Sequence, residues 1–137
     1  MPRGAIADTG PLVAYFDRAE RNHGWAVERI RELEAPLLVC EPVLAEVMYL
    51  LSPLAKAQDA LFELLENGAL RIALRVDEQV VALRVLHRKY RDRPMSLADA
   101  CIVRMAELFD EHDVLTLDSD FSVYRKHSRQ PLTLIHP

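Results

Sequence analysis

Short apolar runs alternate along this chain with longer segments in which apolar residues recur at helical spacing. Such alternation is typical of parallel α/β sheets, because a parallel strand is reached through a crossover that is usually a helix. Strands are predicted over residues 5–7, 37–40, 70–74, 114–117 and 132–135, and helices over residues 12–16, 23–34, 42–51, 52–67, 77–90 and 96–109. The sequence therefore predicts a three-layer α/β fold, with helices on both faces of a central, mainly parallel sheet of about five strands.

Length and composition predict a single domain with its own core. The chain has 137 residues, half of them apolar, which is enough to build a core without disulfides. Both cysteines, Cys40 and Cys101, lie within apolar stretches, where a free thiol behaves as a small hydrophobic group. No apolar run near the first residue has the length of a signal peptide or a membrane span. We therefore expect one domain over residues 1–137, in the reducing cytoplasm and without a membrane segment.

Four carboxylates lie where a predicted strand passes into a helix, or in a helix that should line the same edge of the sheet: Asp8, Glu46, Asp99 and Asp118. Ligands of such sheets bind beyond the carboxyl ends of the strands, and Asp8 and Asp118 both stand at such ends. Two carboxylates ~4 Å apart repel by about 4 kcal/mol at an effective dielectric constant of roughly 20. If the four side chains converge, they must be partly protonated or hold a cation, and oxygen ligands suit Mg²⁺ or Mn²⁺.

Each carboxylate also has a purely structural interpretation. Asp8 and Asp118 are both suited to turns or helix caps. Asp99 follows Ser96 by three residues, which is the pattern of a capping box. Glu46 fits an exposed helix position, but its neighbours one turn away are apolar or aromatic, so we expect it on or beside the buried stripe, where a charge needs a partner. The joint placement of the four favours a shared site over four separate caps.

Basic residues gather in two places although the formal net charge is −4. They are Arg84, Arg88, Lys89, Arg91 and Arg93 in one group, and Arg125, Lys126 and Arg129 in the other. Local patches of charge act separately from the average. The five histidines and two cysteines are scattered and show no zinc-binding spacing.

In their order along the chain, four segments resemble the PIN domain family, and more narrowly the VapC-type ribonuclease toxins of bacterial and archaeal toxin–antitoxin pairs. The segments read DTGPLVA at residues 8–14, PVLAE at 42–46, LADA at 97–100 and LTLDSDF at 115–121, followed by Tyr124 and Arg125. Each segment alone is a weak signal. In this order they are together quite specific, and the resemblance extends over nearly the whole length of the chain.

The resemblance implies a PIN-like fold and a Mg²⁺-dependent endoribonuclease, with Mn²⁺ as a substitute ion, that hydrolyses RNA phosphodiester bonds with a metal-activated water. The residues that match the family's catalytic acids are Asp8, Glu46, Asp99 and Asp118. The implied metal ligands are Asp8, Asp99 and Asp118, and the residues implied to orient the attacking water are Glu46 and Asp118. The implied supporting residues are Thr9, Thr116 and Asp120.

The resemblance also implies three partners: an RNA substrate, a small antitoxin protein that blocks the cleft, and a second copy of the chain in a homodimer. The side chains expected along the RNA backbone are Arg88, Lys89, Arg91, Arg93 and Arg125. Basic groups of this kind equally fit a solvated surface, so both interpretations stay open.

Two positions depart from the family's pattern. Ser96 stands where close relatives often carry another acid, and Cys40 replaces a common hydroxyl residue. Two other functions also remain: a non-catalytic PIN-like RNA-binding module, and a receiver-type phospho-acceptor domain that binds Mg²⁺. The receiver-type domain would need an adjacent acidic pair after the first strand, whereas Asp8 is followed by Thr9.

Overall fold

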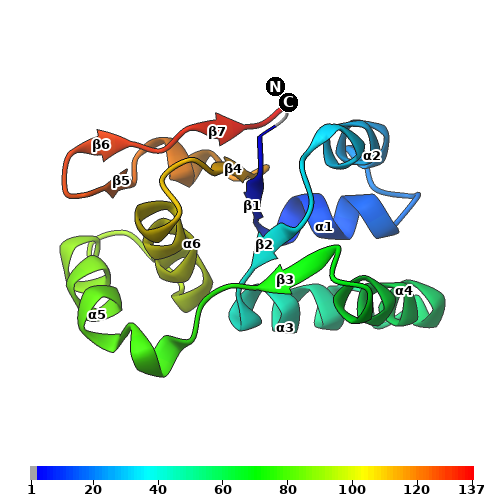
Figure 1. Ribbon diagram of the computed structural model, residues 1–137, viewed down its shortest axis with the longest axis horizontal. Helices are drawn as coiled ribbons and strands as arrows, with labels where there is room; N and C mark the ends of the chain where they lie inside the picture. The colour runs from blue at the N-terminus through cyan, green and yellow to red at the C-terminus, as the bar shows by residue number, and fades with distance from the viewer. Residues whose placement is uncertain (1–2) are drawn as a thin grey trace.

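The computed structural model describes residues 3–137 and contains a five-stranded sheet in the order β3-β2-β1-β4-β7 (Figure 1). All four neighbouring pairs are parallel. The strands are β1 (Ala5–Ala7), β2 (Leu37–Val39), β3 (Leu70–Ile72), β4 (Asp113–Leu115) and β7 (Leu134–Ile135). The predicted α/β class with a five-stranded parallel sheet is therefore confirmed.

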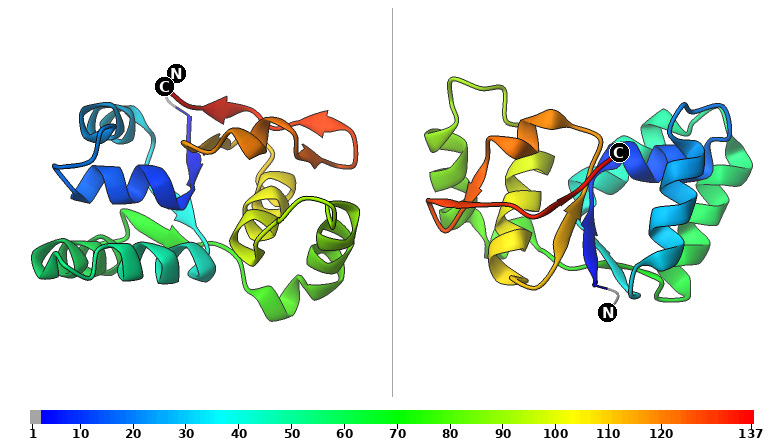
Figure 2. Two further views of the ribbon diagram at one scale, coloured as in Figure 1. Left: turned by 180° about the vertical axis from the view of Figure 1, so that it is seen from behind. Right: turned by 90° about the horizontal axis from the view of Figure 1, so that it is seen from above.

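Helices cover the sheet on both sides. They are α1 (Thr9–Phe16), α2 (His23–Glu32), α3 (Glu41–Leu50), α4 (Ala55–Glu66), α5 (Val80–Lys89) and α6 (Leu97–Leu108), with the 3-10 turns η1 (Val76–Glu78) and η2 (Ser119–Ser122). Helices α1 to α4 lie on one side of the sheet, and α5 and α6 lie on the other (Figure 2). In the part of the chain described, no helix is long and apolar enough to cross a membrane.

The central strands form the middle of the core. Every residue of β1, β2 and β4 is buried, as expected for parallel strands covered on both faces. In the register of the sheet, Ala7 at the end of β1 is paired with Leu115 at the end of β4. Because the two strands end together, the residues that follow them, Asp8 and Thr116, meet at one edge of the sheet.

One helix boundary differs from the prediction because a polar side chain accepts a hydrogen bond from the backbone at the helix end, and another agrees with it. The helix predicted over residues 12–16 begins at Thr9, because Asp8 is its N-cap and accepts a hydrogen bond from the Thr9 amide. Pro11 lies within the first turn of this helix, where its missing N–H costs nothing. The helix predicted to stop at residues 67 and 68 does so, and Gly68 adopts the left-handed conformation with φ +80° that favours glycine.

Two segments depart further from the prediction. The helix predicted over residues 77–90 is divided, with η1 separated from α5 at Gln79. The strand predicted over residues 132–135 is shorter, since only Leu134–Ile135 pairs with β4. Before it lies an unpredicted antiparallel hairpin of β5 (Arg125–Lys126) and β6 (Gln130–Pro131), whose turn includes His127 and Ser128 at positive φ.

Candidate active site

Asp8 lies at the carboxyl end of β1, with only 8% of its surface exposed. Its Oδ1 accepts a hydrogen bond from the Thr9 amide at 2.8 Å, and its Oδ2 accepts one from the Thr116 hydroxyl at 2.7 Å. The Asp8 amide in turn donates to the Leu115 carbonyl at 3.0 Å. The carboxylate is therefore fixed by groups from α1 and from the end of β4.

The surroundings of Asp8 make its negative charge costly. The pKa of Asp8 is raised from 3.8 to about 6. Burial is the largest cause, the hydrogen bonds from Thr116 and Thr9 act against it, and the nearby carboxylates of Asp99 and Asp118 add to it. Three carboxylates from separate parts of the chain therefore act on one another electrostatically. A cation at this position would stabilise the ionised form of Asp8.

Asp99 is both a helix cap and a neighbour of Asp8. The Ser96 hydroxyl accepts a hydrogen bond from the Asp99 amide at 3.0 Å, and Asp99 Oδ2 accepts one from the Ser96 amide at 3.2 Å, so the predicted capping box of α6 is present. Burial raises the pKa of Asp99, with a contribution from Asp118. The structural and the functional interpretations of Asp99 thus apply to the same side chain.

Tyr124 completes the surroundings of Asp99 and did not emerge as a site residue from the sequence. Its hydroxyl donates to Asp99 Oδ2 at 3.2 Å. Burial raises the pKa of Tyr124, and the carboxylates of Asp99, Asp120 and Asp118 raise it further, so the hydroxyl stays protonated and remains a donor. Only its position after residues 115–121 connects Tyr124 with the site in the sequence.

Glu46 extends from α3 and is exposed rather than buried. Of the two predicted positions, on or beside the buried stripe of the helix, Glu46 has the second, because the stripe is formed by Val43 and Val47. The expected partner is present nevertheless: the Thr9 hydroxyl donates to Glu46 Oε2 at 2.8 Å. Thr9 therefore connects Asp8, through its amide, with Glu46, through its hydroxyl.

Thr116 holds the end of β4 against β1. It is almost fully buried, and its hydroxyl donates to Asp8 and accepts a hydrogen bond from the Asp118 amide at 2.9 Å. Asp118 is exposed, and its Oδ1 accepts from the Asp120 amide at 2.9 Å. Asp120 also forms an ion pair with Arg93 at 3.4 Å, so one of the predicted RNA-contacting residues lies beside the acidic residues.

The set of donors suits a hard divalent cation, because carboxylate and hydroxyl oxygens are ligands of Mg²⁺ and Mn²⁺. Asp8, Asp99 and Asp118 affect one another's charge, and Glu46 is joined to Asp8 through Thr9. Within residues 3–137, no three His, Cys, Asp or Glu side chains are arranged closely enough to hold a metal ion as they stand. The assignment of the acidic residues as metal ligands therefore remains a prediction, supported by donor chemistry and charge.

The basic side chains predicted to contact RNA differ in whether they already form hydrogen bonds within the protein. Arg88 and Arg91 are exposed, whereas Lys89 donates to the Ser128 carbonyl at 2.8 Å. The guanidinium of Arg125 donates to three carbonyls nearby in sequence, those of Ser122, Val123 and Tyr124. Arg125 thus has a structural use that its place in the sequence does not indicate.

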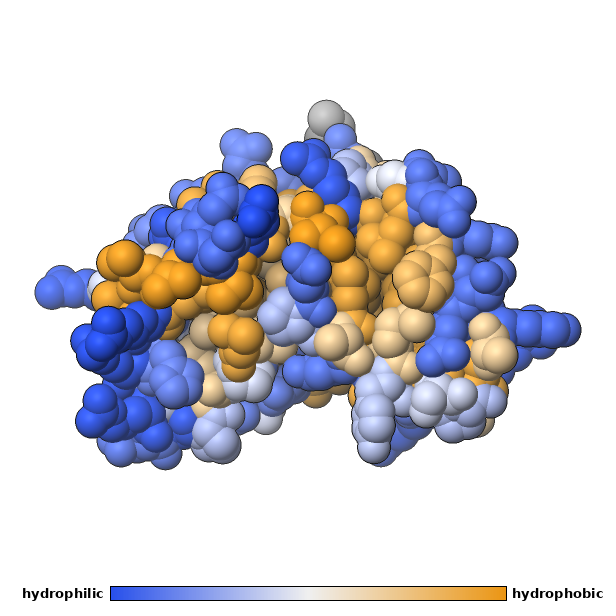
Figure 3. All heavy atoms as spheres, turned by 90° about the horizontal axis from the view of Figure 1, so that it is seen from below, coloured by the Kyte–Doolittle hydropathy of each residue, from blue (hydrophilic) through white to orange (hydrophobic). Residues whose placement is uncertain are grey.

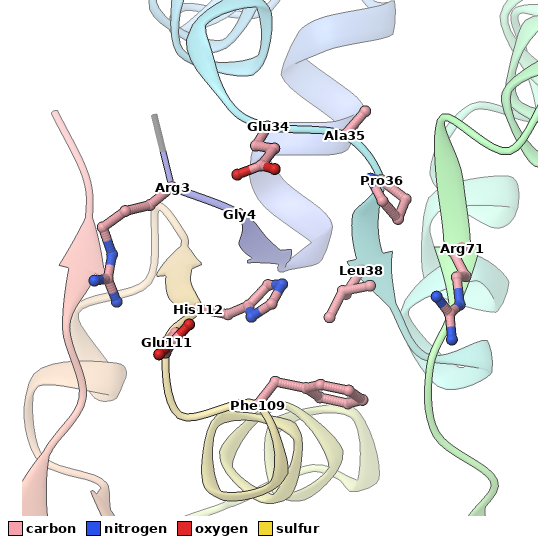
Figure 4. A pocket seen from close by; sticks show the side chains of 10 residues that line it. All are labelled: Arg3, Gly4, Glu34, Ala35, Pro36, Leu38, Arg71, Phe109, Glu111 and His112. Carbon is pink, nitrogen blue, oxygen red and sulfur yellow. The ribbon is translucent and has the colours of Figure 1, made fainter. Parts of the chain in front are cut away.

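A separate cavity of about 530 Å³ lies at the opposite edge of the sheet, where the strands begin (Figure 4). Gly4 precedes β1 there, and Phe109 and His112 come from the connection between α6 and β4. Nδ1 of His112 is buried and has no hydrogen-bond partner in the described residues, while Arg3 forms an ion pair with Asp113 at 3.0 Å. None of the predicted acidic residues lines this cavity, so it lies outside the candidate active site.

Comparison with known proteins identifies the family of the chain. The family model described as "PIN domain" matches residues 5–127, which is most of the chain and includes all four predicted acidic residues. The chain belongs to the PIN domain family. The receiver-type alternative is thereby excluded, and the lysine near the end of this PIN domain, Lys126, pairs with Asp110 at 2.8 Å rather than with the acidic residues.

Relatives of this PIN domain are VapC ribonuclease toxins. It is 33% identical over 115 residues to Ribonuclease VapC26 of Mycobacterium tuberculosis. The aligned residues cover 82% of this chain and 85% of that protein. Its fold is similar to the crystal structure of VapC20 of the same organism, described as a Sarcin-Ricin loop cleaving toxin, with a TM-score of 0.72 and 22% identity. That similarity covers 88% of this chain and 94% of the other. The chain is thus a homologue of known ribonucleases.

Proposed function

We propose that this PIN domain is a Mg²⁺-dependent endoribonuclease and the toxin of a VapBC-like toxin–antitoxin pair. The observation that carries the proposal is the buried carboxylate of Asp8, which lies close enough to Asp99 and Asp118 for their charges to raise its pKa. Repulsion between carboxylates is unfavourable in a purely structural cap, whereas a bound cation would offset it. The identity with Ribonuclease VapC26 supports RNA as the substrate.

The proposed metal ligands are Asp8, Asp99 and Asp118, and Mn²⁺ would serve as a substitute ion. When bound, Mg²⁺ lowers the pKa of water and offsets the negative charge that develops on the phosphate. Thr116 positions two of the ligands, because its hydroxyl contacts the Asp8 carboxylate and the Asp118 amide. The capping box and the Tyr124 hydroxyl fix the orientation of Asp99.

Water attacks the phosphorus atom directly in this proposal, and no covalent enzyme intermediate forms. The bond from phosphorus to the leaving ribose oxygen breaks, the attacking water loses a proton to the solvent, and the leaving oxygen takes one up. Glu46 is exposed and is held at Oε2 by Thr9, so its Oε1 is free to accept a hydrogen bond from the attacking water. Asp118, also exposed, supplies a second carboxylate that would orient the water.

The decisive experiment compares RNA cleavage by the wild-type protein, Asp8→Asn and Asp59→Asn. Asp59 is an exposed residue of α4 and serves as the matched control for loss of one carboxylate. We expect the wild type and Asp59→Asn to cleave RNA with Mg²⁺ or Mn²⁺ and to stop with EDTA, and Asp8→Asn to be inactive. Equal cleavage by Asp8→Asn would refute the assignment, and no cleavage by any of them would favour a non-catalytic RNA-binding module.

The proposed RNA path follows the basic residues from the end of α5 toward the acidic residues. Its exposed members are Arg88, Lys89, Arg91 and Arg93. The ion pair of Arg93 with Asp120 brings this path to the edge of the candidate active site. Contacts with phosphates release counterions, so RNA binding should weaken steeply as salt is added.

The proposed protein partners are a second copy of the chain and a small antitoxin. Apolar side chains gather on the face formed by α3, α4, β3 and α5 (Figure 3). The exposed members of this apolar face are Tyr49, Leu50, Phe62, Ile72, Val80, Val81 and Val85. A surface of this kind is typical of protein interaction sites. A cytoplasmic location fits an RNA substrate and the two free, buried thiols of Cys40 and Cys101.

A further inference from the structure

A second cavity, of about 390 Å³, adjoins the acidic residues at the carboxyl ends of β4 and β7. The Thr116 amide donates to the Ile135 carbonyl at 3.1 Å, which brings the residues after both strands side by side. Thr116 and Asp118 form one wall of the cavity, and His136 forms another. Because Thr116 also contacts Asp8, this cavity and the candidate active site share a wall.

The third wall comes from the loop between α1 and α2, through Arg21 and Asn22. Asn22 is the N-cap residue of α2, where an asparagine usually accepts a hydrogen bond from the first helical turn. Its side chain makes no capping hydrogen bond here. Among residues 3–137, neither the side-chain amide of Asn22 nor the guanidinium of Arg21 forms a hydrogen bond with another protein group. Both polar groups are therefore available to a ligand in the cavity.

The apolar part of the lining comes from Leu117 and Leu134, both half-buried, and from Pro137. Ser119 and Ser122 add two further polar residues to the lining. A few convergent polar groups above an apolar floor are typical of small-molecule sites. A nucleobase matches this combination, because its faces are apolar and its edge carries donors and acceptors. The Asn22 amide offers one donor side and one acceptor side in a single plane. Single-stranded RNA is usually read in this way, by burial of a splayed base and hydrogen bonds to its edge.

We propose that this cavity holds the base of the RNA nucleotide next to the scissile phosphate, and that Asn22 selects that base. The proposal rests on the proposed ribonuclease function. Asp118 lines the cavity and is also a proposed metal ligand, so a base seated here belongs to a nucleotide adjacent to the reacting phosphorus. Arg21, at the mouth of the cavity, supplies positive charge for a phosphate of the same nucleotide.

The first test needs no cleavage. The intact protein is titrated in EDTA with 5′-mononucleotides of the four RNA bases, and the side-chain amide signals of the two asparagines in the chain, Asn22 and Asn67, are followed by NMR. We expect the Asn22 signal to shift and saturate with at least one mononucleotide, while that of Asn67, at the end of α4, stays in place. An unmoved Asn22 signal, or equal shifts of both, would overturn the proposal.

The second test measures cleavage of an RNA library with randomised sequence, followed by sequencing of the product ends. Asn22→Ala should cleave the best wild-type substrates about 10-fold more slowly and lose base preference at one position beside the cut. Arg21→Ala should lower the affinity for RNA, while Arg18→Ala, in the same loop but lining a different cavity, should behave as the wild type. Circular dichroism establishes that the variants are folded.

The two proposals can fail separately. If the wild type cleaves RNA and Asn22→Ala keeps both its rate and its base preference, the base pocket is refuted and the ribonuclease function stands. If the wild type cleaves no RNA, the ribonuclease function fails, and the mononucleotide titration still decides whether the cavity binds a base.

Discussion

The environment of Asp8 disfavours the ionised form of its side chain at neutral pH when no metal ion is bound. We expect Mg²⁺ to raise the melting temperature of the wild type by about 5 °C or more, because a ligand bound only by the folded state stabilises it. In EDTA, Asp8→Asn should melt at a higher temperature than the wild type, because its unfolding free energy should be higher by about 1–3 kcal/mol. Mg²⁺ should not raise the melting temperature of Asp8→Asn. Differential scanning fluorimetry with and without EDTA measures both effects.

Asp59→Asn is the control for this measurement and should respond to Mg²⁺ as the wild type does. If Mg²⁺ stabilised Asp8→Asn as strongly as the wild type, the ion would be binding elsewhere, and the convergence of the acidic residues would lose its support.

The same carboxylate predicts how stability depends on pH in EDTA. Between about pH 4 and about pH 6, the unfolded chain has lost the Asp8 proton, whereas the folded protein keeps it because its pKa is raised to about 6. The folded state binds more protons in this window, so the contribution of Asp8 to the unfolding free energy falls as pH rises, by up to about 3 kcal/mol. Urea unfolding of the wild type and Asp8→Asn across this range measures it, and two parallel pH profiles would contradict the prediction.

Sequence patterns indicated which carboxylates are candidates for the site but not how each side chain is held. The strand before Asp8 and the capping pattern of Ser96 and Asp99 are local signals, and both are present in the structure. The exposure of Glu46 and the hydrogen bond from Tyr124 to Asp99 depend on how distant elements pack. Such contacts join residues far apart in sequence, so no local spacing predicts them.

At the scale of elements, α6 combines a structural and a proposed chemical role at its first turn. Ser96→Ala removes the acceptor of the Asp99 amide and should lower the unfolding free energy by about 1 kcal/mol. Because the Asp99 carboxylate remains, cleavage of RNA at saturating Mg²⁺ should stay within a few-fold of the wild type, while Asp99→Asn should abolish it. Chemical denaturation and a cleavage assay separate the two roles.

Ser52→Ala provides the matched control, since Ser52 is exposed and its hydroxyl makes no hydrogen bond among the described residues. A Ser96→Ala variant of unchanged stability that had lost cleavage would show that Ser96 acts in the chemistry rather than in the cap.

The periodic elements of this fold were predictable, and the irregular ones were not. Apolar periodicity indicated every long helix and every strand of the sheet, because burial of one face fixes that pattern. The break at Gln79 between η1 and α5 has a tertiary cause, since the Gln79 side chain accepts a hydrogen bond from Arg104 of α6 at 2.8 Å. The β5–β6 hairpin likewise depends on a tertiary contact. Lys126 of β5 is buried, and its ammonium group donates to Asp110, which follows α6.

For the whole molecule, the apolar face of α3, α4, β3 and α5 predicts association. Tyr49 and Val81 expose 77% and 81% of their surfaces there. Val81→Asp should shift the protein toward monomer in sedimentation velocity, because a desolvated charge at an interface opposes binding. Cleavage of a short RNA by the folded monomer would then report on the individual active site.

Leu108→Asp is the control, because Leu108 is also exposed but belongs to the end of α6. Unchanged association of Val81→Asp, or equal dissociation of both variants, would exclude this face as the homodimer interface.

The hydrogen bond between Asp8 and Thr116 joins residues 108 positions apart, and this has a consequence during synthesis. A ribosome making the chain releases Asp8 long before Thr116, Asp118 and β4, which is one of the two strands that pair with β1. The nascent chain therefore carries the first acidic residue through more than 100 residues of elongation without the partners that complete the candidate site. If these residues form the active site, we expect a nuclease built in this order to be inactive toward the messenger and the ribosome that produce it until Asp118 has emerged and folded against Asp8.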